Sequence, residues 1–182
     1  MKMSDHAGII CMLTQTFRSG PERTIDGGRA FTPFKNMAHA YHKVWIHLIW
    51  GTKERFPVMG DTIKQEIIEH IREKALLEGI HSDAINATAD HVHCLIELGL
   101  TRTIAAAANQ LKGESSHWVD RRRLTMSHFA WQEGYGAFSV SASQLGKVRT
   151  YICDQERHHE KHTFREEFER LMRAYGMDGE RP

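Results

Sequence analysis

The sequence is poor in several features that would assign it to a specialised class of protein. Its 182 residues contain only three cysteines and four prolines, and the formal net charge is +1. Three widely spaced cysteines without a Cys-x-x-Cys pair argue against a disulfide-rich scaffold and against a cysteine zinc site. The near-neutral charge argues against a protein that coats nucleic acid. Any contact with nucleic acid must therefore be local.

Long hydrophobic runs are also missing. The apolar run from Gly8 to Leu13 is too short and too poorly flanked for a signal peptide, and no stretch approaches the roughly 20 residues that a membrane-spanning helix needs. A hydrophobic content of 41% in 182 residues is enough for the core of one domain. We therefore expect one domain, a cytoplasmic location and no membrane partner.

Residues 1–36 differ in texture from the rest of the chain. Glycine, proline and charged residues interrupt every periodic pattern there, and no amphipathic face persists. This composition is typical of a disordered extension, so we place the folded domain at residues 37–182. Met37 precedes the first strand and could be an alternative start.

The remaining residues predict alternating strands and helices. Aromatic, β-branched and other apolar residues predict strands at residues 41–50, 82–89, 90–98 and 129–141. Apolar residues at helical spacing predict helices at 61–77, from Thr101 or Thr103 to Trp118, and from about Ser143, followed by an amphipathic segment at 164–175. This order predicts an α+β, ferredoxin-like (split βαβ) fold. A four-stranded antiparallel sheet would carry two crossover helices on one face. The third helix would not be one of these crossover helices.

Two histidines on the third predicted strand are candidate metal ligands. His91 and His93 project from one face of the strand, whereas Val92 points to the other. Two neutral imidazoles on one face can bind one divalent ion. The chain contains 13 histidines, so this pair alone is weak evidence. We expect His47, on the first strand, to be a packed or hydrogen-bonded core residue rather than a third ligand.

The third predicted helix carries a phenol and a carboxamide on one face. Tyr151 and Gln155 are four residues apart, so their side chains are neighbours on a helix. Both could approach a metal ion held by the histidine pair. Without that pair, Tyr151 would be interpreted as an amphipathic tyrosine at the edge of the core.

Together these motifs resemble a known family. The His-Val-His pair, the segment Trp131–Ser141 and the motif Val148-x-x-Tyr-Ile-x-x-Gln155 are similar, in this order, to the small single-tyrosine HUH transposases of bacterial insertion sequences (IS200-like) and to their REP-associated relatives. The resemblance covers about residues 37–175. It implies that His91 and His93 bind the metal ion, that Gln155 is a third ligand and that Tyr151 is the nucleophile.

The resemblance also implies an activity, a cofactor and partners. A protein of this family cleaves and rejoins single-stranded DNA through a covalent 5′-phosphotyrosine and a free 3′ hydroxyl group. A phenol with a pKa of about 10 is a poor nucleophile at neutral pH, so a metal ion, Mg²⁺ or Mn²⁺ by the resemblance, must assist. The implied partners are single-stranded DNA with hairpin-containing element ends and a second subunit. In such a homodimer the tyrosine helix of one subunit often completes the site of the other.

Basic residues are the candidate DNA contacts. They are Lys112, Arg121, Arg122, Arg123 and Arg149. A basic cluster at the end of a helix is also expected simply as a solvated end favoured by the helix dipole, so both interpretations stay open. The cluster of His158, His159 and His162 is expected to be a solvated helix end rather than a metal site.

Two other functions fit parts of the pattern. A domesticated, non-cleaving protein of the same fold could bind single-stranded nucleic acid, as RNA-recognition domains do with exposed aromatic residues. Such a binder has no need of a histidine pair facing Tyr151 and Gln155. A zinc hydrolase would need a carboxylate base, and none is evident at a recognisable spacing.

Overall fold

A four-stranded antiparallel sheet forms the centre of the computed structural model, which describes residues 41–159 and 163–177. Its strands are β1 (Val44–Gly51), β2 (His81–Ala87), β3 (His91–Leu98) and β4 (Gly136–Val140), in the spatial order β2-β3-β1-β4. β3 and β1 are the central strands, and all pairs are antiparallel. This is the order of the ferredoxin-like fold, so the predicted fold class is confirmed.

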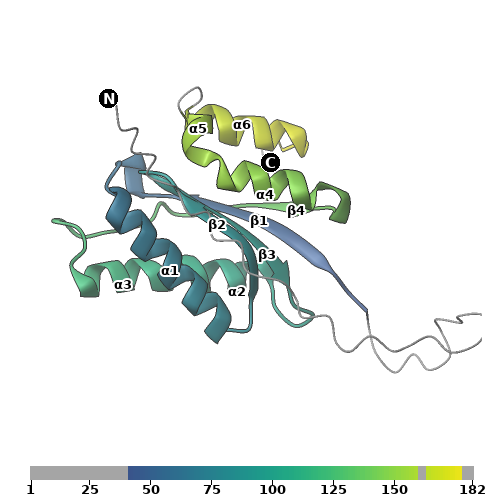
Figure 1. Ribbon diagram of the computed structural model, residues 1–182, viewed down its shortest axis with the longest axis horizontal. Helices are drawn as coiled ribbons and strands as arrows, with labels where there is room; N and C mark the ends of the chain where they lie inside the picture. The colour runs from purple at the N-terminus through teal and green to yellow at the C-terminus, as the bar shows by residue number, and fades with distance from the viewer. Residues whose placement is uncertain (1–40, 160–162, 178–182) are drawn as a thin grey trace, which may run out of the picture.

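One face of the sheet is covered by the two crossover segments (Figure 1). They are α1 (Asp61–Leu77) and a longer helical stretch made of α2 (Ile104–Ala108), the π-helical η2 (Asn109–Gly113) and α3 (Glu114–Arg122). Two short 3₁₀ turns complete the elements on the connections, η1 (Lys53–Arg55) and η3 (Ala142–Gln144). The predicted second helix therefore exists but contains a π turn.

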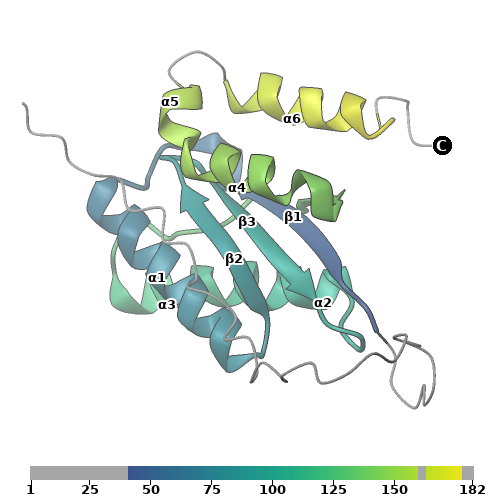
Figure 2. The same ribbon diagram turned by 45° about the vertical axis from the view of Figure 1, so that its right-hand side comes forward.

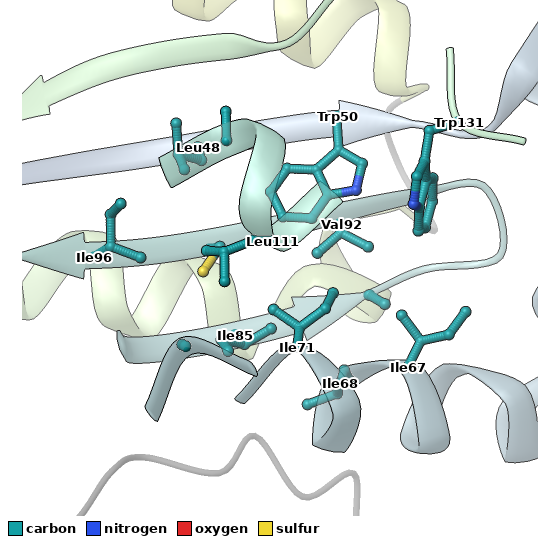
Figure 3. Close-up of a cluster of buried hydrophobic side chains, with 14 of the residues drawn as sticks. Leu48, Trp50, Ile67, Ile68, Ile71, Ile85, Val92, Ile96, Leu111 and Trp131 are labelled. Atoms are coloured by element: carbon teal, nitrogen blue, oxygen red, sulfur yellow. The ribbon is translucent and has the colours of Figure 1, made fainter. Parts of the chain in front are cut away.

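The main hydrophobic core lies between this face and its helices. Leu48 and Trp50 of β1 belong to one buried cluster with Ile67 and Ile71 of α1 and with Leu111 (Figure 3). Each fully buried side chain of this kind stabilises the fold by roughly 1.5–3 kcal/mol relative to an exposed one. Because strand side chains alternate, burying these residues turns the odd-numbered residues of β1 to the opposite face.

That opposite face carries three helices from the C-terminal part of the chain (Figures 1 and 2). They are α4 (Leu145–Cys153), α5 (Gln155–His159) and α6 (Phe164–Ala174). A smaller apolar cluster joins α4 to the sheet, through Ile152 on the helix and Trp45, Leu95 and Val140 on the strands. Thr163 and Glu166 form a capping box that starts α6.

Two predicted elements differ from those observed. The strand predicted at 129–141 is wrong in its first half, because β4 spans only Gly136–Val140 and Trp131 forms a single bridge with Thr52. Gly134 has a positive φ of 77°, which ends any extended run there. The third helix is also not continuous, because Asp154 leaves the helical region with φ −92° and ψ 18°. Tyr151 and Gln155 thus belong to two successive helices.

Two further expectations concern the limits of the chain and membranes. The predicted extension at residues 1–36 lies outside the described residues. Within residues 41–159 and 163–177, no helix is both long enough and apolar enough to cross a membrane.

Candidate metal and nucleophile site

Four side chains on the face covered by α4, α5 and α6 converge on one point. They are His91 and His93 of β3, His159 of α5 and Glu167 of α6, whose ligand atoms all lie within 4.8 Å of one another. His91, His93 and Glu167 are almost completely buried. The prediction that the two strand histidines share one face is confirmed. The expectation that the histidines after Gln155 are solvated is wrong for His159, whose side chain is only 17% exposed.

His91 is held by two polar neighbours at the start of β3. Its Nδ1 atom lies 2.6 Å from Oδ1 of Asp90 and 2.6 Å from Oγ1 of Thr88. Its Nε2 atom lies 3.8 Å from Oε2 of Glu167. Burial lowers the pKa of His91 despite the opposing effect of the Asp90 carboxylate. The ring is thus neutral near pH 7, and its Nε2 atom faces the cluster.

His93 is held by a third histidine. Its Nδ1 atom lies 2.9 Å from Nε2 of His47, and its Nε2 atom lies 3.5 Å from Oε1 of Glu167. Among the described residues this buried Nε2 atom has no hydrogen-bond partner. Burial, followed by the neighbouring His91, lowers the pKa of His93, and burial lowers the pKa of His47 to about 4. His47 is therefore the hydrogen-bonded core residue that its strand position predicts, in contact with a candidate ligand.

Glu167 joins the histidines to the candidate nucleophile. The hydroxyl group of Tyr151 donates a hydrogen bond to its Oε1 atom, and Nε2 of His159 lies 3.0 Å from its Oε2 atom. Burial acts to raise the pKa of Glu167, but the contacts with His159 and Tyr151 and the charge of His91 outweigh burial and lower it. The carboxylate is therefore ionised at neutral pH, in the centre of the cluster.

Tyr151 and Gln155 both contact the carboxylate of Glu167. The ring of Tyr151 lies 6.0 Å from that of His93 between centroids. Burial, and then the hydrogen bond to Glu167, raise the pKa of Tyr151. The buried Gln155 places Nε2 3.3 Å from Oε1 of Glu167, while its Oε1 atom lies 3.0 Å from Nε2 of His159. All these contacts form within one chain.

The donor set fits a divalent ion. Ligand atoms that share one ion at about 2.0–2.2 Å lie roughly 3–4 Å from one another, and the imidazole-to-carboxylate distances of 3.5 and 3.8 Å at His93 and His91 fall in this range. The buried, unpartnered Nε2 atom of His93 is the group that such an ion would satisfy. Neutral imidazoles with one carboxylate can bind Mg²⁺, Mn²⁺ or Zn²⁺.

Sequence reasoning missed Glu167, although a signal was present. Phe164, Phe168 and Leu171 mark the apolar side of α6, and Glu167 lies within this stripe instead of on the polar side. An acidic residue on the buried side of an amphipathic helix requires a polar or cationic partner. His159 had a weaker signal, because it lies four residues after Gln155.

The predicted DNA-contacting residues lie apart from this cluster. Lys112 donates to the carbonyl oxygen of Gly134 at 2.9 Å, and Arg123 ends α3 in a left-handed conformation. The other three form ion pairs, Arg121 with Glu114 at 3.1 Å, Arg122 with Glu66 at 3.6 Å and Arg149 with Asp83 at 2.8 Å. The structure does not bring them to the histidines, and their contact with DNA stays a prediction.

The chain matches a known protein family over most of its length. The family described as "Transposase IS200 like" matches residues 40–155, which include the histidine pair, Tyr151 and Gln155. The chain belongs to the IS200-like transposase family. Transposases are DNA-processing enzymes of DNA recombination. The match ends at Gln155, so His159 and the whole of α6, with Glu167, lie beyond it.

Individual relatives agree with this family. The chain is 23% identical over 119 residues to the ISDra2 transposase TnpA of Deinococcus radiodurans, covering 63% of this chain and 85% of the relative. It is also similar to a crystal structure from D. radiodurans R1 described as that of a transposase, with a TM-score of 0.52, 26% identity and coverage of 66% of this chain and 96% of the other. A REP-associated tyrosine transposase bound to a REP hairpin shares the fold, with a TM-score of 0.50, 14% identity and coverage of 68% and 73%.

Proposed function

We propose that this protein is a single-stranded DNA transposase that cleaves and rejoins DNA through Tyr151. The observation that carries the proposal is the convergence of Tyr151 and the two strand histidines on one buried carboxylate, that of Glu167. A phosphodiester bound at this point would lie beside both the nucleophile and the metal ligands.

In the proposed reaction, the oxygen of Tyr151 attacks the phosphorus atom of a DNA phosphodiester. The new bond joins this oxygen to phosphorus, and the bond between phosphorus and the 3′ oxygen breaks. Tyr151 loses its hydroxyl proton, and the 3′ oxygen takes up a proton and leaves as a hydroxyl group. The 5′ phosphate stays on Tyr151. Attack by another 3′ hydroxyl group then forms a new phosphodiester and releases Tyr151, so the bond energy is conserved.

The residues of the chain have separate roles in this proposal. His91 and His93 bind the divalent ion, Mg²⁺ or Mn²⁺, with an oxygen of Gln155 or of Glu167 as the third ligand. When bound, this ion would polarise the phosphodiester and offset the charge of the transition state. Glu167 orients the hydroxyl group of Tyr151 through its hydrogen bond. Asp90, Thr88 and His47 orient the two histidines.

The proposed substrate is a single strand with a hairpin at the element end. The supporting observation is the shared fold with the hairpin-bound REP-associated transposase. A homodimer remains part of the proposal by family resemblance. Exchange of tyrosine helices between subunits is not needed to assemble the site, because Tyr151 already contacts Glu167 of its own chain.

Formation of a covalent adduct tests the proposal. The purified protein is incubated with labelled single-stranded DNA and Mg²⁺ or Mn²⁺, and the products are separated under denaturing conditions. We expect a protein-DNA adduct that disappears with chelator and in His91→Ala, while much of the DNA binding remains in this variant. DNA binding without adduct in the parent protein would instead support the non-cleaving, domesticated alternative.

A further inference from the structure

A cleft of about 340 Å³ lies beside Tyr151, between β1, β4, α4 and α6. Buried His47 and Glu167 line its inner part, and the exposed side chains of Lys147 and Arg170 line its opening. Its volume is in the lower part of the range of about 300–1,000 Å³ that ligand sites occupy, which suits a nucleotide-sized group. The cleft thus connects the candidate nucleophile with solvent.

The two cations at the opening are available for a ligand. Neither Lys147 nor Arg170 has an ion-pair or hydrogen-bond partner in the part of the chain that the structure describes. By contrast, Arg149 on α4 pairs with Asp83 and Arg165 on α6 pairs with Glu169. A phosphate would therefore meet Lys147 and Arg170 without displacing an internal carboxylate.

An aromatic ring completes the cleft. Tyr175, at the end of α6, is 40% exposed. Its hydroxyl group donates to the carbonyl oxygen of Ser139 at 2.6 Å, and its ring packs against that of Phe138 with 5.0 Å between centroids. These contacts fix an exposed ring at the edge of the cleft, and fixed rings of this kind are platforms on which unpaired bases stack.

We propose that this cleft binds the single strand of DNA next to the bond that is cut, with Lys147 and Arg170 contacting phosphates and Tyr175 stacking on a base. The inference rests on the proposed function, because the assignment of Tyr151 as the nucleophile places the bond that is cut at the inner end of the cleft. Single-stranded DNA carries one negative charge per nucleotide. This suits two cations that have no ion-pair partner among the described residues, on a protein with a formal net charge of only +1. Arg170 and Tyr175 lie beyond the segment that matches the family, so the cleft depends on this chain's C-terminal helix.

Salt-dependent DNA binding tests the inference. Fluorescence anisotropy of labelled oligodeoxythymidylate is measured with the full-length protein in chelator, so that binding does not depend on a metal ion. We expect the double variant Lys147→Gln/Arg170→Gln to bind about 10-fold more weakly near 0.1 M salt. The slope of log affinity against log salt should decrease by about 1.4, because each single-strand phosphate contact contributes about 0.7. Tyr175→Leu should weaken binding without changing this slope.

Control variants distinguish the loss of the two cations in the cleft from a general loss of positive charge. Arg165→Gln removes a cation from the same helix outside the cleft and should change affinity less than about 2-fold. The exchanged pair Lys147→Arg/Arg170→Lys keeps both charges and should keep the slope. Equal affinity and slope in the double variant and the parent overturn the inference, as does an equally large loss in Arg165→Gln.

Failure of the proposed DNA-binding cleft can be distinguished from failure of the proposed DNA cleavage. Adduct formation is measured separately with the same proteins. If the parent forms no adduct but the double variant still loses affinity and slope, the proposed cleavage is wrong and the cleft stands. If the parent forms adduct and the double variant binds DNA with the same affinity and slope as the parent, the assignment of the cleft as a DNA-binding site is wrong and the proposed cleavage stands.

Discussion

The hydroxyl group of Tyr151 donates a hydrogen bond to Glu167, and the same carboxylate lies 3.5 Å from the Nε2 atom of His93. One side chain thus links the candidate nucleophile with the candidate metal ligands. Glu167 belongs to α6, which follows the segment matched by the family. The candidate site of this chain is therefore built partly from residues outside the segment that matches the family.

Replacing Glu167 should weaken metal binding. Glu167→Gln keeps the shape of the side chain but removes the negative charge that faces His91 and His93. We expect the Kd for Mn²⁺, measured by electron paramagnetic resonance or calorimetry, to rise about 10-fold or more, within the range typical for groups that support a metal site. Glu169→Gln, on the exposed side of the same helix, is the matched control. An unchanged Kd in Glu167→Gln would limit Glu167 to orienting Tyr151.

His47 should affect the metal site without being a ligand. When Nε2 of His93 binds the ion, its Nδ1 atom carries the proton and needs an acceptor, and Nε2 of His47 lies at 2.9 Å. His47→Leu removes this acceptor, so Mn²⁺ affinity should fall about 10- to 100-fold. His47→Gln retains an acceptor and should lose less. Equal affinity of the Leu variant and the parent would show that His47 only fills space.

The metal-free protein should lose stability in mild acid. Burial lowers the pKa values of His47, His91 and His93, so the unfolded chain binds protons more readily than the folded one. The stability that each neutral histidine contributes is complete above its pKa in the unfolded chain, about 6.5. This stability is lost as the pH falls toward the lower pKa of the same histidine in the folded chain. For His47, with a folded pKa of about 4, the full loss is roughly 3 kcal/mol at about 1.4 kcal/mol per pKa unit.

Urea denaturation in chelator at pH 7.5, 5.5 and 4.5 measures this loss. The free energy of unfolding should decrease at each step, and His47→Gln should make the decrease smaller. Equal or higher stability of the parent at pH 5.5 than at pH 7.5 would contradict the assignment of buried, neutral imidazoles. The Glu167 carboxylate, whose pKa is also lowered, adds a loss of the same sign below about pH 4.5.

Residues 1–36 should be dispensable for stability. They show neither helical nor strand periodicity, so they offer no face for burial against a core. A protein that starts at Met37 should unfold within about 2 °C of the full chain in a thermal melt. A decrease of many degrees would mean that these residues contribute to the core.

The sequence predicted the fold well because its strands have clear patterns. Alternation in β1 and β3 separates apolar residues such as Leu48 and Val92 from His47, His91 and His93, and this alternation alone gives the correct face for each. Helix spacing likewise brought Tyr151 and Gln155 together, although Asp154 interrupts the helix. Local periodicity was sufficient for these features.

The parts that could not be predicted depend on contacts between distant segments. Glu167 reaches the histidines only because α6 folds back over the sheet, which no local pattern specifies (Figure 2). The basic residues could not be ranked either, since their ion pairs join elements far apart in the sequence, as Arg149 does with Asp83. Trp131 was assigned to a strand, but its side chain packs in the core and donates to Ser115 at 3.0 Å.

The most direct test of Tyr151 as the nucleophile is whether the Tyr151→Phe variant still forms a covalent adduct with DNA. This substitution removes the attacking oxygen and its hydrogen bond to Glu167 and leaves the ring in place, so the fold and DNA binding should change little. With labelled single-stranded DNA and Mn²⁺, we expect adduct in the parent and in the control Tyr135→Phe, and none in Tyr151→Phe. Adduct from Tyr151→Phe at the level of the parent would contradict the assignment of Tyr151 as the nucleophile.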